Sequence, residues 1–414
     1  MWNVPVSRRR VLRDGALAAL ALGAGPHVLL RTARGQSASK RVLVAIFQRG
    51  AVDGLSMVVP YTESRYYALR PSIAIPAPGG GADRALDLDG VFGFHPALAS
   101  LYPFYQAGEV AVVHACGSPA GTRSHFDAQD YMETGMFSAN SGSDGWLNRH
   151  LQSSPAASAS VFRAVATSSQ LPRSLSGAAP TLAVADLSQL RLGRGATASI
   201  VQSAMTEMYG PRTDLLGTTV NNAVEAVDLA GSITAVQPEN GAQYPTGELG
   251  GQLRQIAQLI KADVGLEVAF ANVGGWDTHS GQGSSTGTLA TLLRGLSDSL
   301  AAFRTDLGSR FADVCVVTMS EFGRTVPENG SAGSDHGHAT AMLVFGGTAA
   351  GGRVYGQWPG LDETALLDGR DLAVTTDFRT LFAELVERHL GNPNSGVVFP
   401  GFAYDATTRL GVIA

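Results

Sequence analysis

Short runs of apolar, often β-branched residues alternate with helical patterns along most of the chain. The apolar runs lie at residues 41–47, 109–115, 266–273, 313–319 and 340–347. Apolar residues recur at helical spacing in the segments 95–109, 251–265, 289–307 and 378–391. This alternation is typical of a mainly parallel sheet with helices on both faces. We therefore expect an α/β fold, a three-layer α/β/α sandwich with a mainly parallel central sheet.

The pattern changes between residues 150 and 250. Ser, Ala, Thr and Gly dominate this stretch with weak periodicity, as in SSPAASASVFRAVATSSQ. Clusters of small and polar residues usually separate periodic elements. We interpret residues 150–250 as an inserted, mostly helical subdomain or lid within one large α/β domain.

The first 38 residues have the order of an export signal. Ser7 and three arginines, Arg8 to Arg10, precede a mildly apolar stretch and a small-residue end near TARGQSASK. The adjacent arginines indicate the twin-arginine route. We expect removal of residues 1–38, a mature domain of residues 39–414, and a periplasmic or secreted protein. The alternative is a basic N-terminal tail on an internal protein.

Charge and cysteine content narrow the function classes. The chain has 30 basic and 35 acidic residues without a basic stripe, so nucleic acid is not an expected partner. Beyond the export signal, no apolar run reaches the length of a membrane span. Cys116 and Cys315 lie at or near the ends of apolar runs, where a thiol is usually a buried small hydrophobe. A single disulfide between them is the alternative.

Polar residues collect directly after four of the predicted strands. They are Asp53 after the first strand, Ser124 and His125 after the second, Asp277 and His279 after the third, and Glu321, Arg324, Asp335, His336 and His338 after the fourth. In open α/β sheets, ligands bind outside the carboxyl ends of the strands. We therefore expect these four loops to converge on one edge of the sheet.

Carboxylates and imidazoles gathered in this way suit a divalent metal. Carboxylates brought together repel, and a cation removes the cost of burying them. Mixed Asp and His ligands favour Zn, Mn or Fe over Ca. In extended segments, Asp277 and His279 share one side, as do His336 and His338, while Asp335 points the other way. One short loop could thus serve two metal ions; an ordinary polar turn is the alternative for DHGH.

Ser124 has two interpretations. SHFD fits a capping pattern, so its hydroxyl could cap the helix that begins at HFDAQDYMETG. Alternatively, the same helix start holds an anion while a metal activates the hydroxyl for attack. Thr122 is the second candidate nucleophile.

Several motifs together resemble a known exported bacterial family. VLVAIFQRGAVDGL, HACGSPAGTRSHFDAQDYMETG, FANVGGWDTHSGQ, VVTMSEFGRTVPENGSAGSDHGHA and TTDFRTLFAELV are similar to the family called domain of unknown function 1501. That family resembles a branch of the alkaline phosphatase superfamily, which includes phosphatases, sulfatases and metal-dependent phosphoglycerate mutases. The resemblance implies an alkaline-phosphatase-like sandwich, usually with two metals that activate a nucleophile at a helix start.

The resemblance also implies roles for particular residues. Ser124 lies where the superfamily nucleophile is expected. The implied metal ligands are Asp53, Asp335 and His336 at the first site, and Asp277, His279 and His338 at the second.

The expected function is hydrolysis of phosphate or sulfate esters outside the cytoplasm, with two divalent metal ions and Ser124 as nucleophile. Arg123, Arg324 and His125 would bind the anionic ester substrate, and Arg49 is a further candidate clamp. Two alternatives remain. One is a non-catalytic metal-binding or assembly protein that retains the fold. The other is a metal-free serine hydrolase, because GSSTG at 283–287 fits G-x-S-x-G with Ser285 as nucleophile.

Overall fold

A mainly parallel sheet forms the centre of the molecule. The computed structural model describes residues 41–137, 144–154, 160–190 and 198–414, apart from the side chains of Leu215 and Ala406. The strand order is β11 (Arg353–Tyr355), β5 (Val110–Gly117), β10 (Thr340–Gly346), β9 (Val314–Met319), β1 (Val42–Gln48), β8 (Val268–Val273), β6 (Ala164–Ala166) and β7 (Leu182–Ala183), with β12 (Thr376–Asp377) also paired to β5. Within this sheet β10 is antiparallel to both its neighbours, and the other pairs are parallel.

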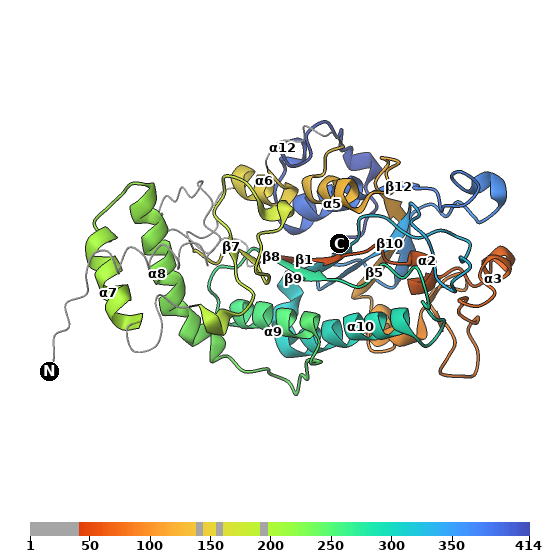
Figure 1. Cartoon of the computed structure of the whole chain (residues 1–414), viewed down its shortest axis with the longest axis horizontal. Coiled ribbons are helices and arrows are strands. Elements are labelled where there is room, and N and C mark those ends of the chain that lie inside the picture. Colours follow the sequence, from red (N-terminus) through yellow and green to blue (C-terminus); the bar gives the residue numbers. More distant parts are fainter. Residues whose placement is uncertain (1–40, 138–143, 155–159, 191–197) are drawn as a thin grey trace.

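Helices cover both faces of this sheet, as Figure 1 shows. All seven residues of β1 are buried, and alternate residues face opposite layers. Val42, Val44 and Ile46 belong to the apolar cluster formed with α9 (Glu248–Lys261) and α10 (Thr288–Leu307). The alternate residues Leu43 and Ala45 belong to a second apolar cluster on the opposite face. This cluster is formed with α5 (His125–Thr134), α6 (Trp146–Ser153), α11 (Phe378–Glu384) and α12 (Ser395–Val398). The three-layer α/β sandwich predicted from the sequence is therefore confirmed.

The expected helix at 95–109 is broken, and this prediction was wrong in detail. A 3-10 turn (η1, Pro96–Leu98) and a short helix (α4, Tyr102–Gln106) replace it. The His95 side chain accepts a hydrogen bond from the Ala97 N–H and so begins the first turn. Pro103 lacks an N–H and stands in the first turn of α4, where proline is tolerated, so the chain restarts there.

The stretch from 150 to 250 contributes to the sheet as well as to helices. Its strands β6 and β7 extend the sheet beyond β8. Helices α7 (Ala198–Tyr209) and α8 (Leu215–Thr234) pack together through a small apolar cluster that includes Val201, Met205 and Val220. In Figure 1 these two helices lie beyond the β7 end of the sheet. The helical part is thus peripheral, whereas the strands belong to the central layer.

Smaller elements complete the described chain. A three-stranded sheet joins β2 (Val58–Val59), β4 (Gly93–Phe94) and β3 (Leu86–Asp87). The short helices are α2 (Gly54–Met57), α3 (Ser64–Leu69), η2 (Arg173–Leu175), η3 (Leu187–Gln189), η5 (Gly308–Asp313), η6 (Glu363–Ala365) and η8 (Ala406–Thr408), and a π-helical turn, η7 (Leu385–His389), continues α11. The predicted export signal lies outside the described residues. A search of the described helices finds none with the length and apolarity needed to cross a bilayer.

Cys116 and Cys315 are buried free thiols. Cys116 pairs with Thr340 at the start of β10, and Cys315 pairs with Gly346 at its end. The two cysteines therefore lie on different strands at opposite ends of β10. This arrangement rules out the alternative of a disulfide between them.

Candidate metal centre

Three loops meet at the carboxyl edge of the sheet. Strands β1, β5, β8 and β9 run in the same direction, so the segments after them emerge on the same side. The β5 loop leads into α5 and its first residue His125, the β8 loop carries Asp277 and His279, and the β9–β10 loop carries His336. Residues far apart in sequence are thus brought together.

The Nε2 atoms of three histidines converge on the Asp277 carboxylate. His336 Nε2 lies 3.0 Å from His125 Nε2 and 3.0 Å from His279 Nε2. It also lies 3.2 Å from Asp277 Oδ1, which is 3.1 Å from His279 Nε2. His125 Nε2 is 3.6 Å from Asp277 Oδ2. Four side chains therefore direct potential metal-binding atoms at one small volume.

Each imidazole has an acceptor for its other ring nitrogen. His125 Nδ1 is 2.8 Å from Glu321 Oε1, and His279 Nδ1 is 3.0 Å from Asp335 Oδ1. His336 Nδ1 is 3.1 Å from the Arg123 carbonyl oxygen. Carboxylate and carbonyl oxygens only accept, so each Nδ1 carries the proton in the neutral ring. The Nε2 atoms are then left with lone pairs, as in histidines that bind metals.

Lone pairs that face one another and a carboxylate repel unless a cation lies between them. Arg324 Nη1 donates to Asp277 Oδ1 at 2.6 Å, and it satisfies only that carboxylate oxygen. Burial alone would raise the pKa of Asp277, but its contact with Arg324 holds the pKa below its usual value. Burial, together with the charges of His125 and Arg324, lowers the pKa of His336, which favours the neutral, metal-binding ring.

The spacing of these atoms fits a small transition metal. His125, Asp277 and His336 form a group whose donor atoms all lie within 4.8 Å of one another. Ligands at about 2.0–2.1 Å from a tetrahedral Zn²⁺ would lie about 3.4 Å apart. The measured separations of 3.0, 3.2 and 3.6 Å bracket this value. Imidazole and carboxylate donors suit Zn, Mn or Fe. The residues present therefore fit a divalent metal.

Asp53 does not join this group. Its carboxylate is fully buried and accepts hydrogen bonds from Arg70 at 2.7 and 3.1 Å, and from Ser56 and Gln282. Burial alone would raise the pKa of Asp53, yet the Arg70 guanidinium and these donors hold it below its usual value. The structure thus pairs this predicted ligand with an arginine.

Asp335 and His338 also lie outside the group of converging donors. Asp335 supports His279 through Nδ1, and Asn329 Nδ2 donates to the same Asp335 oxygen at 2.9 Å. The hydrogen bonds from Asn329 and His279 lower the pKa of Asp335. The His338 side chain is buried, which lowers the pKa of its ring, and the charges of Asp371, Arg123 and Asp368 also act on it. Among the described residues, Asp335 thus contacts a candidate ligand, and His338 lies near a separate ion pair.

Ser124 is directly adjacent to a candidate ligand. It is the N-cap of α5, yet its hydroxyl accepts from the Asp127 N–H at 3.5 Å, which is a long hydrogen bond. His125 follows it, and the carbonyl of the preceding Arg123 contacts His336. Thr122 Oγ1 accepts from the Ser124 N–H at 3.2 Å and so helps to fix this turn.

The predicted anion clamps are engaged with acidic partners. Arg324 is buried and donates to Asp277 and to both the hydroxyl and the carbonyl of Ser334. Arg123 contacts Asp368 at 2.8 Å and Asp371 at 2.5 Å. Ser285, the nucleophile of the metal-free alternative, lies in a bend before α10, whereas a nucleophile elbow directly follows a strand.

The main role that sequence reasoning missed is that of Glu321. Its Oε1 receives hydrogen bonds from the Gly50 N–H and from Gln129 Nε2, and it contacts His125 Nδ1. The signal was available, because Glu321 comes two residues after the buried strand β9, and the parallel neighbour β1 ends at the same edge. His125 was expected to bind substrate, and its Nε2 lies among the candidate metal-binding atoms instead.

Comparisons with known proteins add a family and a distant structural likeness. The sequence profile of a family described as protein of unknown function (DUF1501) matches residues 111–398. No curated protein matches the chain significantly. Among solved structures, the chain is similar to an alkaline phosphatase from the Antarctic bacterium TAB5, with 10% identity and a TM-score of 0.32 over 76% of this chain and 94% of that chain.

Proposed function

The chain belongs to the DUF1501 family of proteins of unknown function, and from its own site we propose that it is a metal-dependent hydrolase of phosphate or sulfate esters. The observation that carries the proposal is the convergence of three Nε2 atoms on Asp277 while each Nδ1 faces an acceptor oxygen. This arrangement is the one expected of a metal centre with oriented ligands.

The chain's own residues would divide the work as follows. His125, Asp277 and His336 would hold the metal. His279 would either be a fourth ligand or lie next to these three ligands. A divalent metal, when bound, supplies Lewis-acid stabilisation of the ester oxygens and favours ionisation of a nearby hydroxyl. Ser124 Oγ would attack the phosphorus or sulfur atom and expel the alcohol. Water would then hydrolyse the ester formed on Ser124 and regenerate its hydroxyl.

The start of α5 supports binding of the anionic ester group. The first N–H groups of a helix have no partners within the helix and carry partial positive charge. Ser124 stands at this point, and its long contact with Asp127 leaves the hydroxyl weakly held. Because Arg123 and Arg324 are each paired with acidic side chains, we assign most of the anion binding to the metal and to the helix start.

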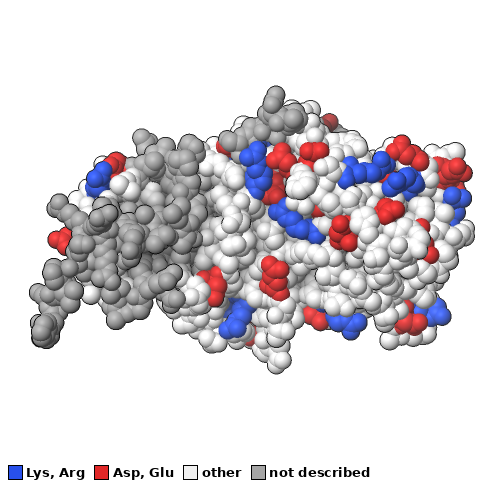
Figure 2. Space-filling view, in the orientation of Figure 1, with Lys and Arg blue, Asp and Glu red and all other residues white. Residues whose placement is uncertain are grey.

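We further propose that the enzyme works outside the cytoplasm. The support is the arginine-containing N-terminal sequence, which has the order of a twin-arginine export signal. The charge balance agrees with a small anionic ester rather than a nucleic acid as partner. On the face shown in Figure 2, basic and acidic residues are interspersed.

The direct test is hydrolysis of 4-nitrophenyl phosphate and 4-nitrophenyl sulfate by the metal-loaded protein. Ser124→Ala should lower kcat by at least a hundredfold while the metal content stays unchanged. Ser309→Ala, at an exposed serine in η5, is the matched control and should behave like the wild type. If Ser124→Ala lowered only the unfolding temperature, Ser124 would be a helix cap. Metal binding without turnover of any ester would favour the non-catalytic alternative.

A further inference from the structure

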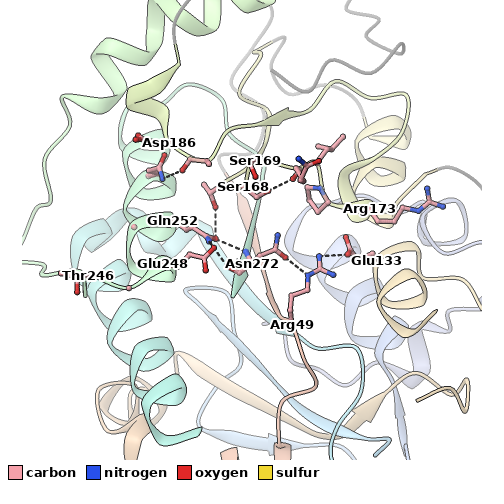
Figure 3. A pocket seen from close by; sticks show the side chains of 18 residues that line it. Arg49, Glu133, Ser168, Ser169, Arg173, Asp186, Thr246, Glu248, Gln252 and Asn272 are labelled. Atoms are coloured by element: carbon pink, nitrogen blue, oxygen red, sulfur yellow. Dashed lines mark hydrogen bonds and ion pairs between the residues drawn. The ribbon is translucent and has the colours of Figure 1, made fainter. Parts of the chain in front are cut away.

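A polar cleft opens at the carboxyl ends of β1, β8 and β6, beside the candidate metal centre. It has a volume of about 880 Å³, within the range of about 300–1,000 Å³ usual for small-molecule sites. Its walls come from the segments after β6 and β7, the first turns of α9, Asn272 of β8, and Arg49 after β1 (Figure 3). Five separate parts of the chain therefore build one cleft.

Amide and hydroxyl side chains predominate in the lining. Among them are Ser168, Ser169, Gln170, Gln252, Gln255 and Asn272. Some of these support the walls: Gln252 bridges to Glu248 and to the backbone of Asn272, and Gln255 holds Leu187 and Ala185. Other lining side chains are free to form hydrogen bonds with a ligand. Ser169 and Gln170 are exposed, and their side chains have no partner among the described residues.

The charges of the cleft do not favour an anion. Arg49 contacts Glu133 at 2.7 Å, and Arg173 contacts Asp130 at 3.1 Å, so each positive charge has a partner. Asp186 bonds to Ser188, and Glu248 bonds to Gln252, and neither carboxylate forms an ion pair with a described residue. In Figure 3 these two carboxylates lie on the side opposite Arg49 and Arg173. Carboxylates without a cation are strong acceptors for hydroxyl groups.

Other ligand classes fit this lining less well. Apolar side chains are few, and Leu171 and Pro172 are the largest of them. A peptide adding to the sheet would need the edge of β7, but Leu182 and Ala183 do not line the cleft. A ligand that carries many hydroxyl groups and no net charge matches both the amides and the carboxylates.

Hydrogen bonds connect the cleft to the metal centre. Arg49 Nη1 donates to Gln129 Oε1 at 2.9 Å, and Gln129 Nε2 donates to Glu321 Oε1 at 3.0 Å. The same Glu321 oxygen contacts the ring of His125. Two side chains thus separate Arg49, in the lining of the cleft, from the candidate metal ligand His125.

We propose that this cleft binds uncharged sugar units of a saccharide, and that a phosphate or sulfate ester on a neighbouring unit of the same saccharide reaches the metal centre. Binding in the cleft follows from its own lining. The second part, that the saccharide bears the ester to be cleaved, rests on the proposed hydrolase function.

The test is calorimetric titration of the metal-loaded protein with neutral tri- and tetrasaccharides that cover the gluco, manno, galacto and xylo configurations. We expect at least one of them to bind, and the double variant Ser169→Ala, Gln170→Ala to weaken that binding by tenfold or more. Both side chains are exposed, so the fold should be retained. Gln106→Ala, at an exposed glutamine outside the lining, should bind like the wild type.

Three results would overturn the proposal. The first is that no saccharide of the panel binds at a concentration of 10 millimolar, which is about the weakest affinity of interest. The second is that the double variant binds the saccharide as tightly as the wild type does. The third is that a cationic glucosamine trimer or a Gly-Ser hexapeptide binds more tightly than every neutral saccharide. Repeating the titration with His336→Ala separates the two claims. If the His336→Ala variant still binds the saccharide, the cleft assignment stands without the metal centre. If the metal-loaded wild type also hydrolyses no ester, the hydrolase proposal is refuted while the cleft assignment remains.

Discussion

At the scale of single residues, the buried pair of Asp53 and Arg70 is a strong electrostatic feature outside the centre. Both side chains are fully buried, and Arg70 also donates to the carbonyls of Thr325 and Val326. Arg70 thereby ties α3 to the loop that carries His336. Asp53 neutralises the guanidinium at the point where this loop is anchored.

Asp53→Asn should therefore destabilise the protein. A buried guanidinium left without its carboxylate usually costs about 3–5 kcal/mol. We expect a loss of that order in the free energy of unfolding, measured by urea titration, while the folded fraction keeps its metal content. Asp313→Asn, at an exposed position without a described partner, should change little. Loss of metal with unchanged stability would instead support the sequence-based assignment of Asp53 as a ligand.

His114 should make stability depend on pH. Its ring is buried, Nε2 contacts the Val58 carbonyl, and Nδ1 accepts from the Ala115 N–H. Burial lowers the pKa of His114 to about 4. Because this value is below the ordinary value of about 6.5, the unfolded chain takes up the proton first as the pH falls. The stabilising contribution is therefore complete above pH 6.5 and is lost as the pH falls toward 4.

A shift of this size corresponds to about 3 kcal/mol between those pH values. Burial lowers the pKa of His95 and His389 to about 4 as well, so they add to the same effect. We expect His114→Gln to show a smaller decrease in the free energy of unfolding between pH 7 and pH 4.5 than the wild type. Equal decreases in both proteins would contradict this account.

The residue scale also shows what the sequence could reveal about the site. Asp277, His279 and His336 were predictable as a set, because each follows a buried strand and shares an edge with the others. The pairing of Asp53 with Arg70 was not, because it depends on α3, a short helix without a strong pattern. The ring orientations of the histidines depend on Glu321, Asp335 and a backbone carbonyl, which only the folded chain brings into contact.

At the scale of elements, the β9–β10 loop depends on close backbone packing. A Cβ on Gly337 would lie 2.3 Å from the carbonyl carbon of Arg324, whereas a Cβ on Gly330 would meet nothing within 4 Å. Gly337 directly follows His336, so a side chain there must displace the loop or Arg324. The loop holds its histidine in place partly because this position lacks a side chain.

Gly337→Ala should weaken metal binding by tenfold or more, because it moves His336 relative to His125 and Asp277. Competition with a fluorescent zinc chelator measures this affinity. Gly330→Ala in the same loop should bind metal like the wild type. If the two variants were equal, the backbone contact between residues 337 and 324 would be irrelevant to the centre.

Glu321→Gln should also weaken the centre without removing a ligand. The carboxylate orients His125 through Nδ1, and loss of such a partner typically costs about 10–100-fold in metal affinity. The same chelator competition gives the value, with Glu225→Gln at an exposed position on α8 as the control. Unchanged affinity would show that His125 needs no carboxylate to hold its orientation.

Elements themselves were partly predictable. The long apolar runs in the sequence predicted β1, β5, β8, β9 and β10, because fully buried strands are continuously apolar. Strands β6 and β7 escaped prediction because they are two or three residues long within a Ser- and Ala-rich stretch. Periodicity also could not show the interruption between η1 and α4.

At the scale of the whole molecule, strand direction creates the site. Parallel β1, β5, β8 and β9 deliver their following segments to one edge, where the candidate metal centre lies beside the polar cleft. The strands after residue 160 extend the sheet toward the cleft, and their loops provide much of its wall. The stretch predicted as an insertion thus contributes to the polar cleft as well as to a peripheral helical pair.

The central claim is that the carboxyl edge of this sheet binds a divalent metal. The most direct measurement is elemental analysis after equilibrium dialysis against Zn²⁺ or Mn²⁺, for the wild type and for His336→Ala, with folding checked by circular dichroism. We predict at least one metal ion per wild-type chain and its loss in the variant. Wild-type protein without stoichiometric metal, or a folded His336→Ala with the same metal content, would contradict the account.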